Sequence, residues 1–254
     1  MVSKISDFTP QMDRGIAWRA RIGLIVLATD HTLEFEFRSL IRMPGVSFYV
    51  SRIANTPLIT PDSLEAMGAL IGDQAGVLLP GESLDVIAYG CTSASIVMGE
   101  EFVFNQIQAV CPESEVTTPI TAAFAAFRAL GVSRIGVLTP YPNEINQLMI
   151  DYIGHNGFRI EAFGSFNMSD DNQVARISTH SIGQALLEMG RDDGIEALFL
   201  SCTNLRSLEV IREAEEILGM PVTSSNHAMA WHTLRLAGVD EPIEGAGRLF
   251  QHPL

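Results

Sequence analysis

The sequence repeats one pattern at an interval of about 110 residues. Residues 21–26, RIGLIV, match residues 134–139, RIGVLT. The arginine of each segment is followed, 70 and 68 residues later, by a cysteine that stands before a threonine and closes an apolar run, at Cys91 and at Cys202. This period is too long for a solenoid repeat, whose units span about 20–50 residues. We therefore expect a duplicated α/β domain.

Apolar runs alternate with helix-like segments along both halves. Strands are expected at 22–28, 46–53, 85–88 and 195–200, and helices at 32–42, 95–110, 144–155, 174–189 and 205–218. Continuously apolar strands that alternate with helices are typical of parallel sheets covered on both faces. The predicted fold is α/β, with two pseudo-symmetric lobes, each a parallel sheet flanked by helices. We assign residues 1–117 and 223–254 to the first lobe, residues 118–222 to the second, and residues 1–20 to an irregular arm.

The two cysteines are the candidate catalytic residues. In open parallel sheets ligands bind at the carboxyl ends of the strands, and Cys91 and Cys202 are expected at such ends. Each also precedes a predicted helix, whose N-terminal amides stabilise a thiolate or a bound carboxylate. A thiol can attack carbon or transfer a proton. The pattern predicts one active site that faces both half-chains, with chemistry that needs neither metal nor coenzyme.

The composition limits the classes of partner that the protein is expected to bind. The formal net charge is −14, which argues against binding to nucleic acid or to an anionic membrane. Three cysteines do not make a disulfide framework, residues 1–20 do not resemble a signal peptide, and no apolar run is long enough to span a bilayer. We predict a cytoplasmic protein that acts on a small carboxylate or amino-acid-like substrate; whether it forms a homo-oligomer is left open.

Several short motifs extend the pattern along nearly the whole chain. They are RIGLI at 21–25 with TLE at 32–34, GCTS at 90–93, TPY at 139–141 with EIN at 144–146, DN at 171–172 with VARI at 174–177, SCTN at 201–204, and GAGRLF at 245–250. In this order and spacing the chain resembles the Asp/Glu racemase superfamily, and within it the branch of maleate cis–trans isomerases and arylmalonate decarboxylases. It is also similar to isomerase-like proteins of ectoine utilisation.

The resemblance implies two lobes around a cleft and a role for each matching residue. Cys91 would be the nucleophile or first proton-transfer thiol, and Cys202 the partner acid or base. Substrate would be held by Thr92, Ser93, Tyr141, Asn172, Thr203 and Asn204. The residues alone leave other roles open, because Thr92, Thr203 and Asn172 could simply cap helices and Tyr141 could shape a turn between two prolines.

Two positions discriminate within the branch. The decarboxylases keep only the second cysteine and have glycine at the first, so the presence of both favours an isomerase or racemase. Maleate isomerases carry asparagine where this chain has Asp30. A carboxylate 4 Å from a charge of a dianionic substrate would cost about 1–4 kcal/mol. We hypothesise that Asp30 faces an amine or amide nitrogen, unless it merely caps the helix at 32–42.

The expected activity is cofactor-independent isomerisation of a small carboxylic acid. In cis–trans isomerisation the Cys91 thiolate would add to a C=C bond while Cys202 handles the proton; in racemisation the two sulfurs would exchange the α-proton on opposite faces. Both need one sulfur ionised near pH 7, so one thiol pKa must fall below its usual value of about 8.5. The alternatives are a decarboxylase that uses Cys202 alone, and a non-catalytic small-acid binding protein.

Overall fold

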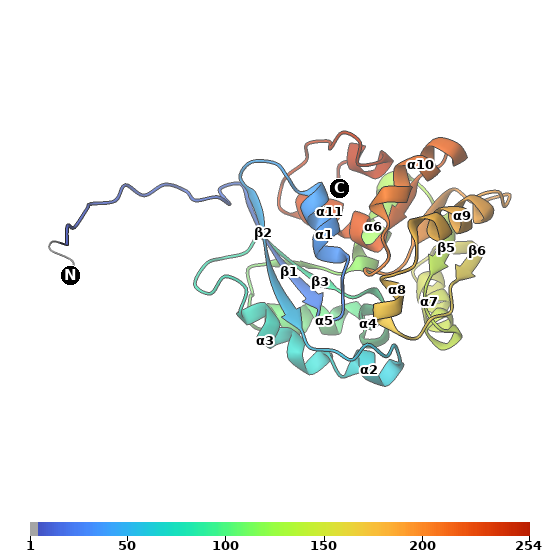
Figure 1. The fold of residues 1–254 in the computed structure, drawn as a ribbon, viewed down its shortest axis with the longest axis horizontal. Coiled ribbons are helices and arrows are strands. Elements are labelled where there is room, and N and C mark those ends of the chain that lie inside the picture. The colour runs from blue at the N-terminus through green and yellow to red at the C-terminus, as the bar shows by residue number, and fades with distance from the viewer. Residues whose placement is uncertain (1–4) are drawn as a thin grey trace.

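The computed structural model describes residues 5–254 and contains two four-stranded sheets (Figure 1). Every neighbouring pair of strands is parallel. The first sheet has the order β2-β1-β3-β4 and the second β6-β5-β7-β8, which is the same order in each repeat. The strands are β1 Ala20–Leu27, β2 Val46–Ile53, β3 Val86–Gly90, β4 Glu115–Thr117, β5 Arg134–Thr139, β6 Arg159–Ser165, β7 Ala197–Leu200 and β8 Val222–Ser224. The predicted fold class is confirmed.

Helices cover the sheets and connect the lobes. They are α1 Leu33–Leu40, α2 Pro61–Glu65, α3 Ile71–Gly76, α4 Thr92–Met98, α5 Glu100–Gln108, α6 Pro119–Leu130, α7 Asn143–His155, α8 Asp171–Val174, α9 Thr179–Met189, α10 Leu208–Leu218 and α11 Ser225–Leu236, with short 3₁₀ helices at Gly68–Leu70 and Arg248–Gln251. Helix α6 leads from the first sheet into the second, α11 leads back, and the two pack along each other (Figure 1). The site therefore lies in a molecule whose lobes are joined twice.

The repeated RIG motif has the same structural role in both lobes. The arginine that begins it donates its backbone N–H to a carboxylate at the start of the neighbouring strand, Asp85 in one sheet and Glu196 in the other, at 2.7 and 2.9 Å. A Cβ at Gly23 or Gly136 would come within 2.9 or 2.6 Å of a leucine side chain. Glycine in both strands thus leaves room for the leucine packed over it, and a larger residue would displace that side chain.

A shared core holds the lobes together. One buried apolar cluster contains residues of both sheets and of α6, including Phe127, whose ring meets Phe199 of β7 edge to face at 5.5 Å. A second cluster fills the space between the first sheet, α1 and α11, around Phe37 and Trp231. Strand β8 spans the predicted lobe boundary at 222/223, and α11 packs on β3 and β4 of the first sheet. The lobe boundaries stay a prediction.

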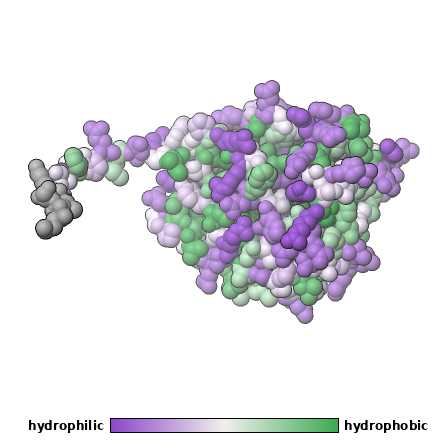
Figure 2. Space-filling model, in the orientation of Figure 1, coloured by the Kyte–Doolittle hydropathy of each residue, from purple (hydrophilic) through white to green (hydrophobic). Residues whose placement is uncertain are grey.

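The first described residues form an arm. Residues 5–15 have no helix or strand, and the ribbon runs away from the lobes before it joins β1 (Figure 1). Four apolar side chains along the arm, Ile5, Phe8, Met12 and Ile16, are at least three-quarters exposed, and the arm stands off the body in the space-filling view (Figure 2). Between residues 5 and 254, no helix is both long and apolar enough to cross a membrane.

Candidate active site

The two cysteines converge on one cavity. Cys91 follows the last residue of β3, and Cys202 lies two residues beyond the end of β7. The strands are equivalent in the two repeats, and their carboxyl ends face the junction of the lobes. Both sulfurs are buried, with Cys91 4% and Cys202 5% exposed. Six residues predicted for the site line this cavity together: Cys91, Thr92, Ser93, Tyr141, Cys202 and Thr203.

The cavity is closed in this structure. Its volume is about 20 Å³, which is room for about one water molecule. Much of its wall is formed by residues 55–67, which follow β2 and include α2. We call them the covering segment. Backbone hydrogen bonds fasten this segment to the second lobe, from Ile59 N–H to Ser169 O at 2.9 Å and from Asp171 N–H to Pro57 O at 2.8 Å. A carboxylic acid of several carbons fits only after the covering segment moves.

Each sulfur interacts with the residue two positions later. The Cys91 sulfur lies 3.7 Å from Ser93 Oγ, and the Cys202 sulfur accepts a hydrogen bond from Asn204 N–H at 3.3 Å. Burial nevertheless raises the pKa of the Cys91 thiol to about 12 and raises the pKa of the Cys202 thiol well above its usual value. In the closed cavity, burial therefore favours the neutral thiol over the expected thiolate at both cysteines. Ionisation has to accompany opening or substrate binding.

The two thiols differ in their relation to a helix. Helix α4 begins directly after Cys91, as expected. Helix α10 begins only at Leu208, and the N–H groups at its start donate to the buried carboxylate of Glu36, from Ser207 at 2.6 Å and from Leu208 at 3.0 Å. The prediction that a helix N-terminus supports Cys202 was wrong, because α10 starts later than predicted and Glu36 already occupies its free amides.

Tyr141 is fixed at the wall of the cavity. Its backbone carbonyl accepts hydrogen bonds from Asn146 Nδ2 at 2.8 Å and from Ser165 Oγ at 2.7 Å, and the residue is 2% exposed. Burial raises the pKa of its phenol well above 10, and the nearby Cys202 and Cys91 raise it further. The phenol stays protonated, and its interaction with Cys202 acts to lower the pKa of that thiol. Tyr141 can therefore donate a hydrogen bond to sulfur or to substrate.

Asp30 caps a helix beside the cavity. Its Oδ1 accepts the backbone N–H groups of Thr32 at 2.7 Å and of Leu33 at 2.8 Å, at the start of α1. Its Oδ2 is buried and has no hydrogen-bond partner, and burial raises the pKa of this carboxyl to about 7. Asp30 is not one of the residues that line the cavity. The structure thus shows the capping role and places the residue behind the wall.

Two predicted asparagines also lie behind the wall. The Asn204 side chain accepts a hydrogen bond from His31 N–H at 2.8 Å and donates one to the Asp171 carbonyl at 2.9 Å, so that it joins the two lobes. Asn172 Oδ1 lies 3.0 Å from His31 Nε2. Neither asparagine is among the cavity-lining residues in this closed arrangement. A substrate role for either remains a prediction.

Asp171 lines the cavity instead. Its side chain is 7% exposed, and Oδ2 accepts a hydrogen bond from the hydroxyl of Thr29, across the lobes. Burial raises the pKa of its carboxyl. The sequence motif DN at 171–172 contains this residue, but the helix was predicted to start only at 174. Because α8 begins at Asp171, the carboxylate and not the following amide points to the cavity wall.

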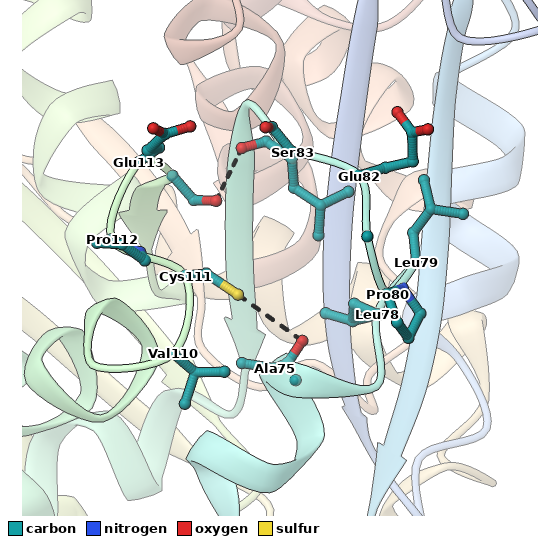
Figure 3. A pocket seen from close by; sticks show the side chains of 14 residues that line it. Ala75, Leu78, Leu79, Pro80, Glu82, Ser83, Val110, Cys111, Pro112 and Glu113 are labelled. Carbon is teal, nitrogen blue, oxygen red and sulfur yellow. Dashed lines mark hydrogen bonds between the residues drawn. The ribbon is translucent and has the colours of Figure 1, made fainter.

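A larger hollow lies at the opposite end of the first sheet (Figure 3). Its volume is about 390 Å³, and it surrounds Cys111 and the loop from Leu78 to Leu84, near the amino ends of β3 and β4. The Cys111 sulfur is 3.9 Å from the Ala75 carbonyl oxygen (Figure 3). Cys111 is the one cysteine among the described residues that line this hollow. This hollow is larger than the cavity between the lobes, but the paired thiols place the chemistry in the smaller cavity.

The arylmalonate decarboxylase family model matches residues 22–250, so the chain belongs to this family. The maleate isomerase of Nocardia farcinica is 28% identical over 241 residues, 91% of this chain and 95% of that protein. The arylmalonate decarboxylase of Bordetella bronchiseptica is 29% identical over 200 residues, 76% of this chain and 81% of that one.

Solved structures of maleate isomerases have the same fold as this chain. A cysteine variant of the Pseudomonas putida maleate isomerase, crystallised with maleate, superposes with a TM-score of 0.84 at 25% identity and covers 92% of this chain and 98% of its own. A Nocardia farcinica maleate isomerase variant with a covalently bound succinylcysteine intermediate gives 0.80 at 28% identity, covering 91% and 98%. These findings confirm the predicted branch of the superfamily and the prediction of an isomerase that acts through cysteine.

Proposed function

We propose that Cys91 and Cys202 catalyse the isomerisation of one small carboxylic acid bound between them. The observation that carries this proposal is the convergence of two equivalent thiols, one from each repeat, on a single cavity with the Tyr141 hydroxyl. A structural role would not require both repeats to place sulfur at the same wall. The residues that line the cavity supply nucleophile, proton donor and hydrogen-bond donors from the chain itself.

In the cis–trans reaction, the Cys91 sulfur forms a bond to one alkene carbon, and the electron pair of the C=C bond moves toward the carboxylate of the neighbouring carbon. The former double bond is then a single bond and can rotate. Elimination restores the alkene and releases the sulfur. Cys202 delivers a proton to the neighbouring carbon and takes a proton back on elimination, while Tyr141 donates a hydrogen bond to the developing negative charge. The covalent succinylcysteine seen in the Nocardia farcinica relative supports an adduct of this type.

Sulfur ionisation is coupled to binding in this proposal. Closure of the empty cavity keeps both thiols neutral, because burial raises the pKa of each. Opening of the covering segment admits water and substrate together, and Ser93 and Asn204 then offer hydrogen bonds to whichever sulfur ionises. General acid–base assistance by the second thiol contributes roughly 10²–10⁴-fold.

Decarboxylation is the second candidate, because the family model and the Bordetella bronchiseptica relative carry that name. Incubation in D₂O with maleate, aspartate, diaminobutyrate and an arylmalonate, followed by ¹H NMR, separates the two. We expect a new isomer or loss of the α-proton signal in the wild type, and neither in Cys91→Gly. Release of CO₂ from the arylmalonate that persists in Cys91→Gly would instead establish the decarboxylase. A cytoplasmic location also remains a proposal.

A further inference from the structure

The charges around the cavity are unusual for a site that receives an acid. Of the described residues that line the cavity, Asp171 alone has a carboxylate, and none is a lysine, arginine or histidine. A second carboxyl, Asp30, lies directly behind this wall. Two basic residues lie beside this wall and not in it: Arg52 donates to the Asp30 backbone carbonyl at 3.0 Å and pairs with Glu34, and His31 contacts Asn172 next to Asp171. The cavity is therefore negative and lacks an obvious partner for a second substrate carboxylate.

Each of the two carboxyls has an oxygen with capacity to spare. Asp171 Oδ2 accepts the Thr29 hydroxyl, and the Asn204 side chain also interacts with this carboxyl, which still leaves acceptor sites of the carboxylate unused. Asp30 Oδ1 caps α1, whereas its Oδ2 is buried without a partner. Both side chains are more than nine-tenths buried. Buried carboxylate oxygens normally accept hydrogen bonds, so the unmatched Oδ2 of Asp30 behind the wall and the spare acceptor sites of Asp171 in the wall favour a ligand that brings a donor.

The carboxyls also oppose the chemistry of the empty site. Burial is the largest cause of the raised pKa of the Cys91 and Cys202 thiols. The negative charges of Asp171 and Asp30 raise both pKa values further. A cation bound at Asp171 would cancel part of this effect and favour the thiolate at the moment when substrate is present. A dianion would do the opposite, because it adds charge of the same sign.

We propose that Asp171 is the residue that determines substrate specificity and that it binds a protonated amine, so that the substrate carries an ammonium group as well as a carboxylate. This inference rests on the proposed function and names the substrate class for the same site. The carboxylate of the substrate lies toward Thr92, Ser93 and Thr203, whose hydroxyls and amides line the same cavity. The ammonium lies toward Asp171 Oδ1, and Asp30 strengthens the negative potential from behind.

Binding of four simple acids tests the inference. Isothermal titration calorimetry of the full chain with butyrate, succinate, 2-aminobutyrate and 4-aminobutyrate compares molecules that differ mainly in the ammonium group and its place. We expect at least one amino acid to bind about tenfold or more tightly than butyrate and succinate, as one charge pair at short range provides. In Asp171→Asn this preference should vanish while butyrate binds as before. A loss of affinity that is equal for all four acids would mark Asp171 as merely structural and overturn the inference.

Two comparisons keep the result interpretable. Thr29→Val removes the hydrogen bond to Asp171 but leaves its charge, so this variant should keep the preference for the amino acids. If Asp171→Asn does not fold, the wild-type series decides alone, and equal or tighter binding of butyrate or succinate overturns the inference. Cys91→Ser and Cys202→Ser should retain the binding preference. Turnover that survives in both serine variants would refute the catalytic proposal without touching the ammonium preference, so the two failures are distinguishable.

Discussion

Alkylation of Cys91 should be slow and steeply dependent on pH. Burial raises the pKa of this thiol to about 12, which disfavours the thiolate by about 4 kcal/mol relative to an ordinary thiol. At pH 8 the ionised fraction is then about 10⁻⁴, compared with about 10⁻¹ for an unperturbed thiol. Because the thiolate is the reacting form, iodoacetamide should modify Cys91 roughly 1,000-fold more slowly than an ordinary thiol, before any steric protection.

Site-resolved peptide mass spectrometry between pH 6 and pH 10 measures this rate. We expect each unit of pH to raise the rate at Cys91 about tenfold with no plateau, because the pH range lies below the pKa. Cys111 is partly exposed and should be labelled first. Cys111→Ser removes that background and should leave the rate at Cys91 unchanged. Labelling of Cys91 as fast as Cys111 at pH 7, or a plateau near pH 7, would refute a neutral buried thiol in the ligand-free protein.

Three further substitutions test the surroundings of the site. Burial raises the pKa of Asp30 to about 7, so the folded state holds this proton more tightly than the unfolded state does. Stability should therefore fall as the pH rises from about 4 to about 7. Thermal melts of Asp30→Asn should lose this pH dependence, and a dependence that persists would belong to other groups. The same variant should turn over maleate faster, and unchanged or slower turnover counts against a charge effect of Asp30. Glu36→Ala should lower the free energy of unfolding in urea by about 3–5 kcal/mol because it strands four buried donors, whereas a loss below about 1 kcal/mol would show that water replaces the carboxylate. Gly90→Ala should cost about 1–3 kcal/mol in the same assay, because its Cβ would lie 2.9 Å from the Ile25 carbonyl oxygen; a neutral result would mean that β1 and α1 yield easily.

The repeat predicted the parts of the fold that depend on local pattern. Residues 46–53 form β2 with the predicted bounds, and the runs that lead to Cys91 and Cys202 are strands in equivalent positions. Strands β3 and β7 are buried along their whole length, so an uninterrupted apolar run is enough to identify them, whereas the edge strand β2 is recognised by its alternating pattern. The chemistry could be inferred for the same reason, since equivalent strands in a duplicated domain deliver their carboxyl ends to equivalent places.

Helix boundaries were less predictable because single residues interrupt otherwise helical patterns. The segment predicted as one helix at 95–110 is divided at Gly99, which has a φ of +84°. The segment predicted at 174–189 is divided before α9, where Ser178 Oγ accepts the backbone N–H of Ser181 at 3.1 Å. A glycine can end a helix and an N-cap serine can begin the next one at little cost, and apolar periodicity alone does not detect either.

The wall of the cavity depended on contacts between distant residues. The covering segment meets the second lobe through hydrogen bonds between residues more than 100 positions apart, such as Asp171 N–H to Pro57 O. The same contacts turn Asp171 to the cavity and leave Asn172 behind it. No local motif encodes this choice, because it is made only when the two lobes pack.

Turnover by single cysteine variants tests the two-thiol mechanism most directly. The substrate is whichever acid the D₂O incubation identifies, and the measurement is kcat for Cys91→Ser, Cys202→Ser and the matched control Cys111→Ser. We predict that each of the first two loses at least roughly 10²–10⁴-fold while the control keeps the wild-type rate. A rate close to wild type with either sulfur of the pair replaced would contradict a reaction carried by both.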